Sequence, residues 1–460
     1  MSSSVKNISS ILSDVSNQSH GDKAFTASNA SKAHVLSKVL IITYYWPPSG
    51  GAGVQRWLKF SKYLPESGWE PLILTVAPEF AAYPVKDNSL IEDLPSSIRV
   101  FTTPATNYFR IYNKDQTRIP SAGFANSIDN SLKGKILRFI RGNLFIPDPR
   151  RGWNKYAFQK ACELIETEGI QNIVTTSPPH STQLIGLKIK KKYPGINWVA
   201  DLRDPWTDIY YYSQFYPTFI SRWIDRKYEE TVLRKTDKII TVGISLKKLF
   251  QSRVKGIENK TEVITNGYDE DDFSEIFSSD PPVFTITYVG TLSDIYPVDG
   301  FLKALQSFKE KNNEFILRFI GSVVQSQKEL IQSVTSDSNR EFISYVDHSA
   351  AVQFMLNTSV LLLIIPDHQS NKSIITGKIF EYIASGRPII CLGPSDGDAA
   401  EIIRTGGYGK TFDYGDSKGI YEYLIQLISG KSLTEKNSHR AYSRRELTRR
   451  IIPLLIKAKS

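Results

Sequence analysis

The stretch Ser373–Pro388, SIITGKIFEYIASGRP, decides how the fold of this chain is interpreted. Apolar residues recur at helical spacing from Ile379 onward, and Gly386 ends the pattern. The fully apolar run VLLLIIP at 360–366 precedes the stretch, and the β-type run PIICLG begins at Pro388. Because these runs are short and apolar, the order strand, loop, helix, strand is predicted, which is that of a βαβ unit.

The loop of this unit opens onto the N-terminus of a helix. Free backbone N–H groups and the helix dipole favour an anion at such a corner. Lys378 stands in the first helical turn, where a cation is unfavourable unless an anion is bound, and Glu381 follows one turn later. A phosphate beside Lys378 and two hydroxyls beside Glu381 would describe a nucleoside diphosphate. A plain βαβ unit with a surface lysine is the alternative from these residues alone.

The length and composition are those of a globular protein with two domains. The chain has 460 residues, of which 41% are hydrophobic and 23% charged, and domains usually have about 100–200 residues. Neither an apolar stretch of about 18 residues nor a basic and then apolar N-terminus is present, so no transmembrane helix or signal peptide is predicted. Cys162 and Cys391 lie in predicted core elements, so buried free thiols and a cytoplasmic location are expected.

The formal net charge of +10 indicates an anionic partner. Nucleic acid is the least favoured candidate because no nucleic-acid motif occurs, and none is expected to bind. Phosphorylated substrates and an anionic membrane surface remain. In the segment 132–151, Leu132, Ile136, Phe139 and Ile140 form an apolar stripe among Lys and Arg residues. Such a helix would suit peripheral binding to an anionic bilayer, and packing of the stripe on the domain is the alternative.

Two α/β patterns follow one another along the chain. Residues 1–34 lack periodicity and are predicted to be a disordered leader. A Rossmann-like domain is predicted for residues 35–276 and another for 277–440, with an acidic linker between them. Residues 441–460 are predicted to form a C-terminal helix. The segment 80–150, rich in Pro, Asn and Tyr, is interpreted as irregular.

Candidate site residues of the first domain lie in loops that follow predicted strands. Open α/β sheets place their chemistry at the carboxyl ends of strands. Glycines in the first loop would let a backbone approach a ligand, or would simply allow a tight turn. For the charged cluster in DLRDPW, an internal Arg–Asp pair that shapes the loop is the alternative. The candidates are Gly50, Gly51, Gly53, Gln55 and Arg56 in the first unit, His180 in TTSPPHS, and Asp201, Arg203 and Asp204 in DLRDPW.

A series of motifs runs in order from Val39 to about Phe412. They are YYWPPSGGAGVQR, TTSPPHSTQLIGL, DLRDPW, KIITVGISLKKLF, VITNGYDEDDF, YVGTL, RFIGS and GKIFEYIASGRPIICLG. Their order and spacing resemble the GT-B glycosyltransferases of the retaining family 4, which build capsule, lipopolysaccharide and related glycans. The resemblance implies two Rossmann-like domains facing across a cleft, with the C-terminal helix crossing back to the first domain. The SPP and DLRDPW motifs resemble those of members that transfer aminosugars or deoxysugars onto polyprenyl-diphosphate glycans.

This resemblance implies transfer of a sugar from a nucleotide-diphosphate sugar to a glycan or polyprenyl-linked acceptor, with retention. The first domain would bind the acceptor at Gly50, Gly51, Gly53, Gln55 and Arg56. Neither a metal nor a cofactor is expected, because backbone N–H groups and Lys378 would stabilise the departing diphosphate. The expected catalytic residues are Lys378, Arg203, Asp204 and His180, and the expected donor-binding residues are Gly290, Thr291, Gly321, Ser373, Gly377, Lys378, Ile379 and Glu381.

The chain departs from the family pattern around the donor. The family signature has a Glu, seven residues and a second Glu, and here Ser373 and Glu381 fill these two positions. The second Glu binds the ribose hydroxyls in the family, so the resemblance gives that role to Glu381. Thr291 and Val298 stand where family members have an Arg and a Lys. Lys378 is therefore expected to replace one of these cations.

Two other function classes are left open by the sequence. Arg203 is the nearest match by position to the strand-end His of many members, so His180 is not a direct match. A nucleotide-sugar 2-epimerase on the same fold would turn over without an acceptor. A non-catalytic scaffold with a degenerate site would bind the donor without transfer.

Overall fold

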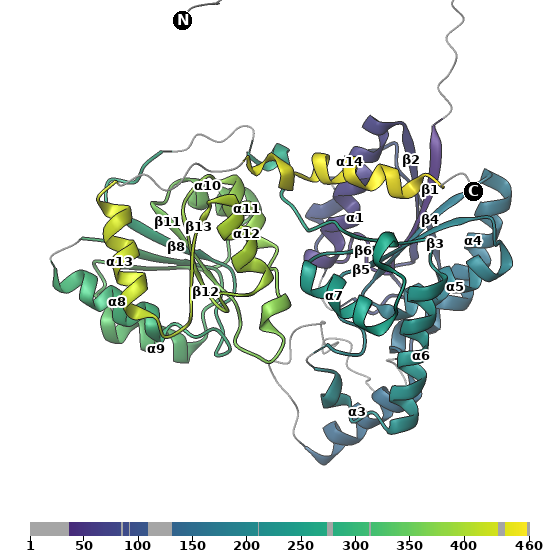
Figure 1. Cartoon of the computed structure of the whole chain (residues 1–460), viewed down its shortest axis with the longest axis horizontal. Coiled ribbons are helices and arrows are strands. Elements are labelled where there is room, and N and C mark those ends of the chain that lie inside the picture. Colours follow the sequence, from purple (N-terminus) through teal and green to yellow (C-terminus); the bar gives the residue numbers. More distant parts are fainter. Residues whose placement is uncertain are drawn as a thin grey trace, which may run out of the picture. The chain divides into compact units, whose positions relative to one another are not determined.

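The computed structural model describes residues 36–83, 86–91, 93–108, 131–209, 211–273, 279–311, 314–430 and 438–457. The predicted leader, residues 1–34, lies outside the described residues. Figure 1 follows the chain through two parallel sheets and the helices around them.

The first sheet is parallel, with the strand order β3-β2-β1-β4-β5-β6-β7. The direction of strand succession reverses between β1 and β4, which opens a crevice at the carboxyl ends of the strands. The register pairs Leu40 with Leu72 and with Ile173, and all three side chains are buried. The strands are β1 Ser37–Ile42, β2 Trp69–Val76, β3 Arg99–Thr103, β4 Asn172–Ser177, β5 Asn197–Leu202, β6 Lys238–Thr241 and β7 Thr261–Val263.

The second sheet is also parallel, with the order β10-β9-β8-β11-β12-β13. Its reversal lies between β8 and β11, so the loops after these two strands meet at one edge of the sheet. The expected α/β fold with two Rossmann-like sheets is confirmed. The strands are β8 Thr285–Val289, β9 Ile316–Ile320, β10 Arg340–Ile343, β11 Val360–Ile364, β12 Ile389–Leu392 and β13 Gly409–Phe412.

Helices connect the parallel strands, and the stretch Ser373–Pro388 contains the short helix α11. It ends where Gly386 adopts a φ of 70°, in the left-handed region that glycine tolerates best. The α-helices are α1 Ala52–Tyr63, α3 Leu132–Leu144, α4 Asn154–Glu168, α5 Gln183–Lys192, α6 Phe219–Lys235, α7 Ile244–Arg253, α8 Asp299–Glu310, α9 Gln325–Val334, α10 His348–Leu356, α11 Lys378–Ala384, α12 Asp398–Gly406, α13 Ser417–Ile428 and α14 Arg444–Leu455.

The expectation that residues 80–150 are irregular is wrong in part, because this segment contains the strand β3. β3 pairs with β2 at the edge of the first sheet. Its five residues alternate between half-buried and exposed before Thr103, so it lacks the continuous apolar run of the central strands. An edge strand needs less apolar surface, and the sequence signal is correspondingly weak.

Helix α14 packs on the first sheet, as the family resemblance implied. Leu447, Ile451 and Leu455 share a buried cluster with Val54 and Trp57 of α1, and Figure 1 draws α14 beside α1. The helix begins later than expected, because the Ser443 side chain accepts a hydrogen bond from the Glu446 N–H and caps it there. The domain boundaries at 276/277 and 440/441 stay predictions.

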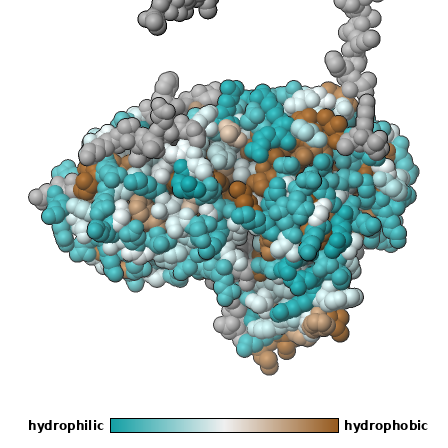
Figure 2. Space-filling view, viewed as in Figure 1, coloured by the Kyte–Doolittle hydropathy of each residue, from teal (hydrophilic) through white to brown (hydrophobic). Residues whose placement is uncertain are grey.

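The apolar stripe on α3 is exposed rather than packed. Leu132, Ile136 and Phe139 keep 76%, 50% and 47% of their surface exposed. Figure 2 shows brown side chains at the lower end of the view, where Figure 1 labels α3. The alternative in which this stripe packs on the domain is therefore wrong for these residues.

The first turns of α6 extend this apolar surface. Phe219, Ile220 and Trp223 are 83%, 67% and 55% exposed. Asn143 of α3 joins the two helices, since its side-chain amide donates to the Tyr216 carbonyl oxygen and its Oδ1 accepts from the Thr218 N–H. We call the surface made by Leu132, Ile136, Phe139, Leu144, Phe219, Ile220 and Trp223 the α3–α6 patch.

Both cysteines, Cys162 and Cys391, are buried free thiols, as expected. Within the ranges that the structure describes, none of the helices combines the length and the apolar character needed to cross a bilayer.

Candidate active site

The side chain of Lys378, at the start of α11, reaches the carboxyl end of β8. Its Nζ donates a hydrogen bond to Tyr288 Oη at 3.2 Å and lies 4.2 Å from the centre of the Tyr288 ring. A Cβ atom added to Gly290 would lie 2.8 Å from this Nζ. The loop after β8 and the start of α11, which are distant in sequence, therefore meet at Gly290.

The loop after β9 joins the same place through Gly321. A Cβ atom on Gly321 would lie 2.6 Å from the Gly290 carbonyl oxygen. Both glycines have positive φ angles, 124° for Gly290 and 115° for Gly321. Neither position accepts a side chain without displacing backbone or Lys378. The structure thus brings together three of the residues expected to bind the donor, and it leaves this corner lined by backbone and one ammonium group.

Burial and neighbouring charges set the protonation of this corner. Burial lowers the pKa of Lys378 to about 8, although Glu381 opposes the shift. Burial also raises the pKa of Glu381, although His348, Arg444 and Lys378 act in the opposite direction. Lys378 and Glu381 therefore lie close enough to interact, as their one-turn spacing suggested.

His348 is a site residue that the sequence reasoning missed. Its Nε2 lies 3.1 Å from Asp272 Oδ2 and 4.0 Å from Glu381 Oε1. The hydrogen bond to Asp272 raises the pKa of His348. No local pattern connects these residues, because His348 begins α10, Glu381 lies in α11 and Asp272 belongs to the acidic run before β8.

The remaining predicted donor residues have different surroundings. Ser373 donates from Oγ to the Ser370 carbonyl oxygen at 2.9 Å, so its hydroxyl is used within its own turn. Ile379 is buried in the core and its N–H donates to Thr376. Gly377 precedes α11 and is exposed, and Thr291 is exposed while its carbonyl oxygen accepts from Tyr288 Oη. The Ile379 N–H is therefore not open to a ligand, contrary to expectation.

The Arg203 side chain connects loops at the carboxyl ends of strands of the first sheet through hydrogen bonds. It donates from Nη1 to the Gly53 carbonyl oxygen at 2.9 Å and from Nε to the Ser177 carbonyl oxygen at 3.0 Å. Burial lowers the pKa of Arg203 and raises the pKa of Asp204 beside it. The structure thus joins Gly53 of the expected acceptor side to Arg203 of the expected catalytic group, and Asp204 follows Arg203 in the same loop.

Arg56 lies in the core and not on an acceptor-facing surface, which corrects its expected place. Its side chain has no exposed surface, and its Nη2 lies 3.1 Å from Asp201 Oδ1. The guanidinium also donates to the carbonyl oxygens of Thr265 and Ile264, each at 2.8 Å. The internal Arg–Asp pair considered for DLRDPW exists, but Asp201 makes it with Arg56. Of the other acceptor-side candidates, Gly51 is exposed, and Gly50 and Gln55 are half-buried.

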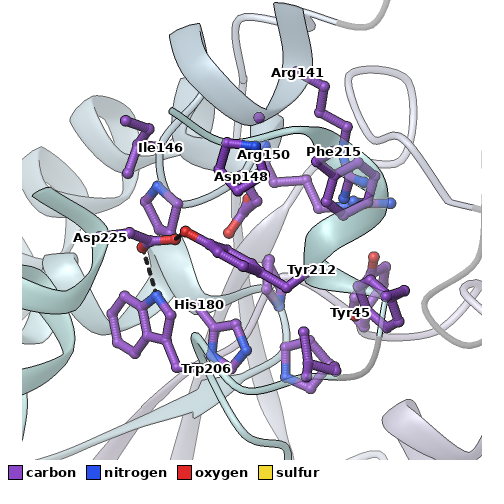
Figure 3. A pocket seen from close by; sticks show the side chains of 17 residues that line it. Tyr45, Arg141, Ile146, Asp148, Arg150, His180, Trp206, Tyr212, Phe215 and Asp225 are labelled. Atoms are coloured by element: carbon purple, nitrogen blue, oxygen red, sulfur yellow. Dashed lines mark hydrogen bonds between the residues drawn. The ribbon is translucent and has the colours of Figure 1, made fainter. Parts of the chain in front are cut away.

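His180 lines a separate pocket in the first domain (Figure 3). Its ring stacks on Trp206 with centroids 4.9 Å apart. Burial lowers the pKa of His180 to about 4, so the imidazole is neutral at pH 7. Its Nδ1 is buried without a hydrogen-bond partner among the described residues. Among the described residues, no hydrogen bond, ion pair or ring contact links His180 to Lys378.

Residues 283–430 match the family model of the group 1 glycosyl transferases. These residues form a group 1 glycosyl transferase domain, and the chain has the GT-B fold. The corner formed by Gly290, Gly321, Lys378 and Glu381 lies inside the matched region, and we call it the donor corner after the role that we propose for it below. Over the described parts of the chain, no group of three or more His, Cys, Asp or Glu residues is arranged to hold a metal ion.

Solved structures share the fold of the glycosyltransferase at low sequence identity. A glycosyltransferase from Rickettsia africae has 13% identity and a TM-score of 0.54, over 91% of this chain and 94% of that chain. The lipopolysaccharide outer core galactosyltransferase WaaB has 13% identity and a TM-score of 0.53, over 91% and 98%. The catalytic domain of starch synthase IV from Arabidopsis thaliana, bound to ADP and acarbose, has 12% identity and a TM-score of 0.52, over 90% and 95%. No curated protein matches the sequence.

Glu381→Ala is expected to weaken donor binding by about 1.5–3 kcal/mol, the usual worth of a hydrogen bond to a charged group. The reason is the position of Glu381 beside Lys378, where a ribose next to the diphosphate would lie. Isothermal calorimetry with nucleotide-diphosphate sugars measures the effect. Glu401→Ala is the matched control, because Glu401 makes an exposed ion pair with Arg404 on α12. Equal affinities of wild type and Glu381→Ala would refute the role.

Proposed function

We propose that the glycosyltransferase moves a sugar from a nucleotide-diphosphate sugar to a lipid-linked glycan, with retention and without a metal ion. The observation that carries the proposal is the donor corner. There the ammonium of Lys378 lies within 2.8 Å of the space that a Cβ on Gly290 would occupy. A glycine-lined corner with one cation suits a diphosphate that must approach the backbone closely.

The chemistry assigned to this corner is stabilisation of the leaving group. As the bond from the sugar to the diphosphate breaks, negative charge grows on the diphosphate oxygens. Lys378 and the neighbouring backbone N–H groups would meet that charge in a half-buried site, where electrostatic interactions are stronger than in water. These groups would do the work that a divalent cation does elsewhere. The ADP bound to starch synthase IV, which shares the fold, supports a nucleotide donor.

Retention and the lipid-linked acceptor rest on the family resemblance. Retention requires the acceptor to attack from the face that the diphosphate leaves. The acceptor would then approach from the strand-end loops of the first sheet, which Arg203 holds together through Gly53 and Ser177. A lipid-linked glycan is consistent with the lipopolysaccharide galactosyltransferase among the proteins of the same fold.

The α3–α6 patch supports binding to an anionic membrane surface. It combines exposed apolar side chains with the exposed cations Lys133, Lys135 and Arg222. The segments 132–145 and 211–224 contain no Asp or Glu. Apolar side chains would enter the boundary between headgroups and acyl chains, while the cations would contact anionic headgroups.

Removing the two lysines of α3 tests the membrane contact. Lys133→Gln together with Lys135→Gln is expected to weaken binding to phosphatidylglycerol vesicles about 30-fold, since each surface cation is worth about 1 kcal/mol. Binding of the wild type should also weaken as salt rises, because charges are screened beyond about 8 Å at physiological ionic strength. Vesicle sedimentation measures both effects. Lys303→Gln together with Lys309→Gln on α8 removes the same charge from exposed positions elsewhere and should change little.

A direct assay tests the proposed function as a whole. Nucleotide-diphosphate sugars are first screened for a rise in melting temperature, because a ligand that binds only the native state stabilises it. Those that bind are then incubated with lipid-linked oligosaccharides, and mass spectrometry looks for a product heavier by one sugar. Turnover of the nucleotide sugar without an acceptor would favour the epimerase. Binding without any turnover would favour the scaffold.

A further inference from the structure

Arg444 is the first residue of α14, the helix that packs on the first sheet. Its N–H donates a hydrogen bond to the Tyr268 carbonyl oxygen at 2.8 Å. Tyr268 belongs to the buried cluster that contains Phe380 and the other apolar residues of α11. The Arg444 guanidinium lies 5.6 Å from the centre of the Phe60 ring of α1. Arg444 is thus held between segments that pack on α1 and on α11, and it lies outside residues 283–430, which match the family model.

The Arg444 side chain is buried and lacks a bound counter-charge. It is only 5% exposed, and its Nη1 is buried without a hydrogen-bond partner among the residues that the structure describes. Arg56 lies 5.0 Å from the centre of the same Phe60 ring, so two guanidinium groups lie against one ring. Burial lowers the pKa of Arg444 to about 9, and the charge of Arg56 adds to this shift. Arg444 therefore remains charged at pH 7 in an unfavourable place, and such a buried donor requires an explanation.

Two carboxylates oppose the lowering of the pKa of Arg444, those of Asp269 and Glu381. Asp269 is already bound, because its Oδ2 lies 2.7 Å from Lys59 Nζ and its Oδ1 accepts a hydrogen bond from the Tyr63 hydroxyl. The Glu381 carboxylate accepts no hydrogen bond from any residue in the described ranges. Glu381 is therefore the acid that is available to Arg444.

The charged groups around Glu381 come from four elements. His348 of α10 lies 4.0 Å from Oε1 and is itself bound to Asp272, which follows β7. Lys378 lies on the same helix as Glu381, and Arg444 comes from α14. Burial is the largest cause that raises the pKa of Glu381, and the charge of Asp272 adds to it. The groups that oppose the rise are His348, Arg444 and Lys378. Because the pKa of Lys378 responds to Glu381 and not to Arg444, the two cations act on Glu381 from different positions.

Glu381 needs its negative charge for the role proposed above. An ionised carboxylate accepts hydrogen bonds on both oxygens, whereas a protonated one has lost part of this capacity, and a buried carboxyl group without a cation takes up a proton. We propose that Arg444 is a positioning residue of the donor site, and that its guanidinium holds Glu381 as the oriented carboxylate that accepts the ribose hydroxyls of the donor. The inference rests on the proposed function, and it adds a residue from α14 to the site.

Isothermal calorimetry with UDP, ADP and GDP, in the absence of acceptor, tests this role. We expect Arg444→Met to bind the nucleotide that the wild type prefers on the order of tenfold more weakly, the usual worth of one charged hydrogen bond. Inorganic pyrophosphate, which lacks a ribose, should bind both proteins equally. Arg445→Met is the matched control and should change neither affinity, since Arg445 is the next residue of α14 and pairs with Glu66 and Glu270.

The dependence of affinity on pH distinguishes this role from a purely structural one. Without the Arg444 cation, Glu381 should take up its proton at a higher pH. As the pH is lowered from about 7.5, the nucleotide affinity of Arg444→Met should therefore fall earlier than that of the wild type. Lys378 stays charged in this range because its pKa is about 8. Arg444→Lys keeps the charge, so its affinity should fall at the same pH as that of the wild type and most of the lost affinity should return.

A double substitution tests the connection between the two residues directly. In Glu381→Gln no carboxylate remains for Arg444 to hold, so adding Arg444→Met should change the nucleotide affinity by less than about twofold. Melting temperatures without ligand show whether each variant is folded. If Arg444→Met does not fold, Arg444→Gln, which is neutral and can form hydrogen bonds, replaces it in every comparison.

Three results would overturn the proposal. They are an unchanged nucleotide affinity in Arg444→Met, a tenfold loss that persists in the Glu381→Gln background, and the same pH dependence in Arg444→Met as in the wild type. These measurements need no sugar transfer. If the wild type transfers sugar while Arg444→Met binds nucleotide normally, the role of Arg444 alone is refuted. If Arg444 and Glu381 prove coupled but no acceptor receives a sugar, the proposed function alone is refuted.

Discussion

Lys378→Ala is expected to lower kcat by on the order of 10²-fold, similar to the loss of one group that stabilises an oxyanion. The positions that carry cations in related enzymes are occupied by Thr291 and Val298 here, and Val298 is buried in the core. Lys378 is then the cation beside Gly290 that would stabilise the negative charge that grows on the departing diphosphate. Lys378→Arg should keep part of the activity, because the charge survives while the geometry changes. The assay uses saturating donor and acceptor.

The melting temperature of Lys378→Ala should stay close to that of the wild type. The ammonium loses a contact with the Tyr288 ring worth about 0.5–1 kcal/mol, and removal of a buried charge offsets that loss. Lys372→Ala is the matched control, since Lys372 lies in the same loop and makes an exposed ion pair with Asp396. Normal turnover by Lys378→Ala, or a loss of activity that tracks unfolding, would make Lys378 a structural residue.

The pKa of Lys378 also predicts how activity depends on pH. In the free enzyme burial lowers this pKa from 10.5 to about 8. Hence kcat/KM should fall as the pH rises through about 8, because the free enzyme loses the ammonium. A bound diphosphate would raise the pKa, so kcat should persist to higher pH. A kcat/KM profile that stays flat between pH 7 and 10 would contradict the role of Lys378.

Lys378 should affect stability and kcat/KM in opposite directions as the pH rises: kcat/KM should fall, while the free energy of unfolding should gain. Between pH 8 and 10.5 the unfolded chain holds more protons on Lys378 than the native protein does. The free energy of unfolding therefore gains a contribution that increases with pH in this window. Lys378→Met lacks this contribution, so the melting temperature of the wild type should improve relative to Lys378→Met from pH 8 towards 10.5. Thermal unfolding without ligand measures it.

Arg56→Met is expected to lower the free energy of unfolding by about 3–5 kcal/mol, the usual cost of leaving a buried charge without its partner. The carboxylate of Asp201 would lose the guanidinium, and the carbonyl oxygens of Ile264 and Thr265 would lose their donors. Trp57 and Thr176 would still donate to Asp201, which limits the loss. Urea unfolding followed by tryptophan fluorescence measures the change.

A surface ion pair provides the control for Arg56. Arg99→Met removes an arginine that pairs with Glu70 and Glu168 while 41% exposed, and such pairs contribute about 0–1 kcal/mol. Where Arg56→Met remains folded, its KM for the acceptor should be that of the wild type. If Arg56→Met has unchanged stability and a raised KM for the acceptor, Arg56 contacts the acceptor, as the sequence suggested.

The individual residues of the donor corner could be predicted from the sequence, but the contacts that bring them together could not. Gly290 and Gly321 directly follow short apolar strands, and Lys378 and Glu381 lie in the first turn of the helix that comes after a third such strand, so local periodicity places each of them. His348 and Tyr288 carry no comparable signal. They join the corner because β8, α10 and α11 pack together, and such packing depends on contacts between segments distant in sequence.

The sequence by itself determined the order of strands and helices and the helix start at Lys378, because periodicity and end signals are local properties of a chain. It did not reveal the edge strand β3, which has little apolar surface. Only the tertiary structure decided which charged residues are structural and which face a site. Arg56 and Arg203 look alike in sequence, yet the first is fully enclosed with Asp201, while the second is half-buried among the strand-end loops whose carbonyl oxygens it binds. Burial decides this difference, and burial is a property of the packed fold.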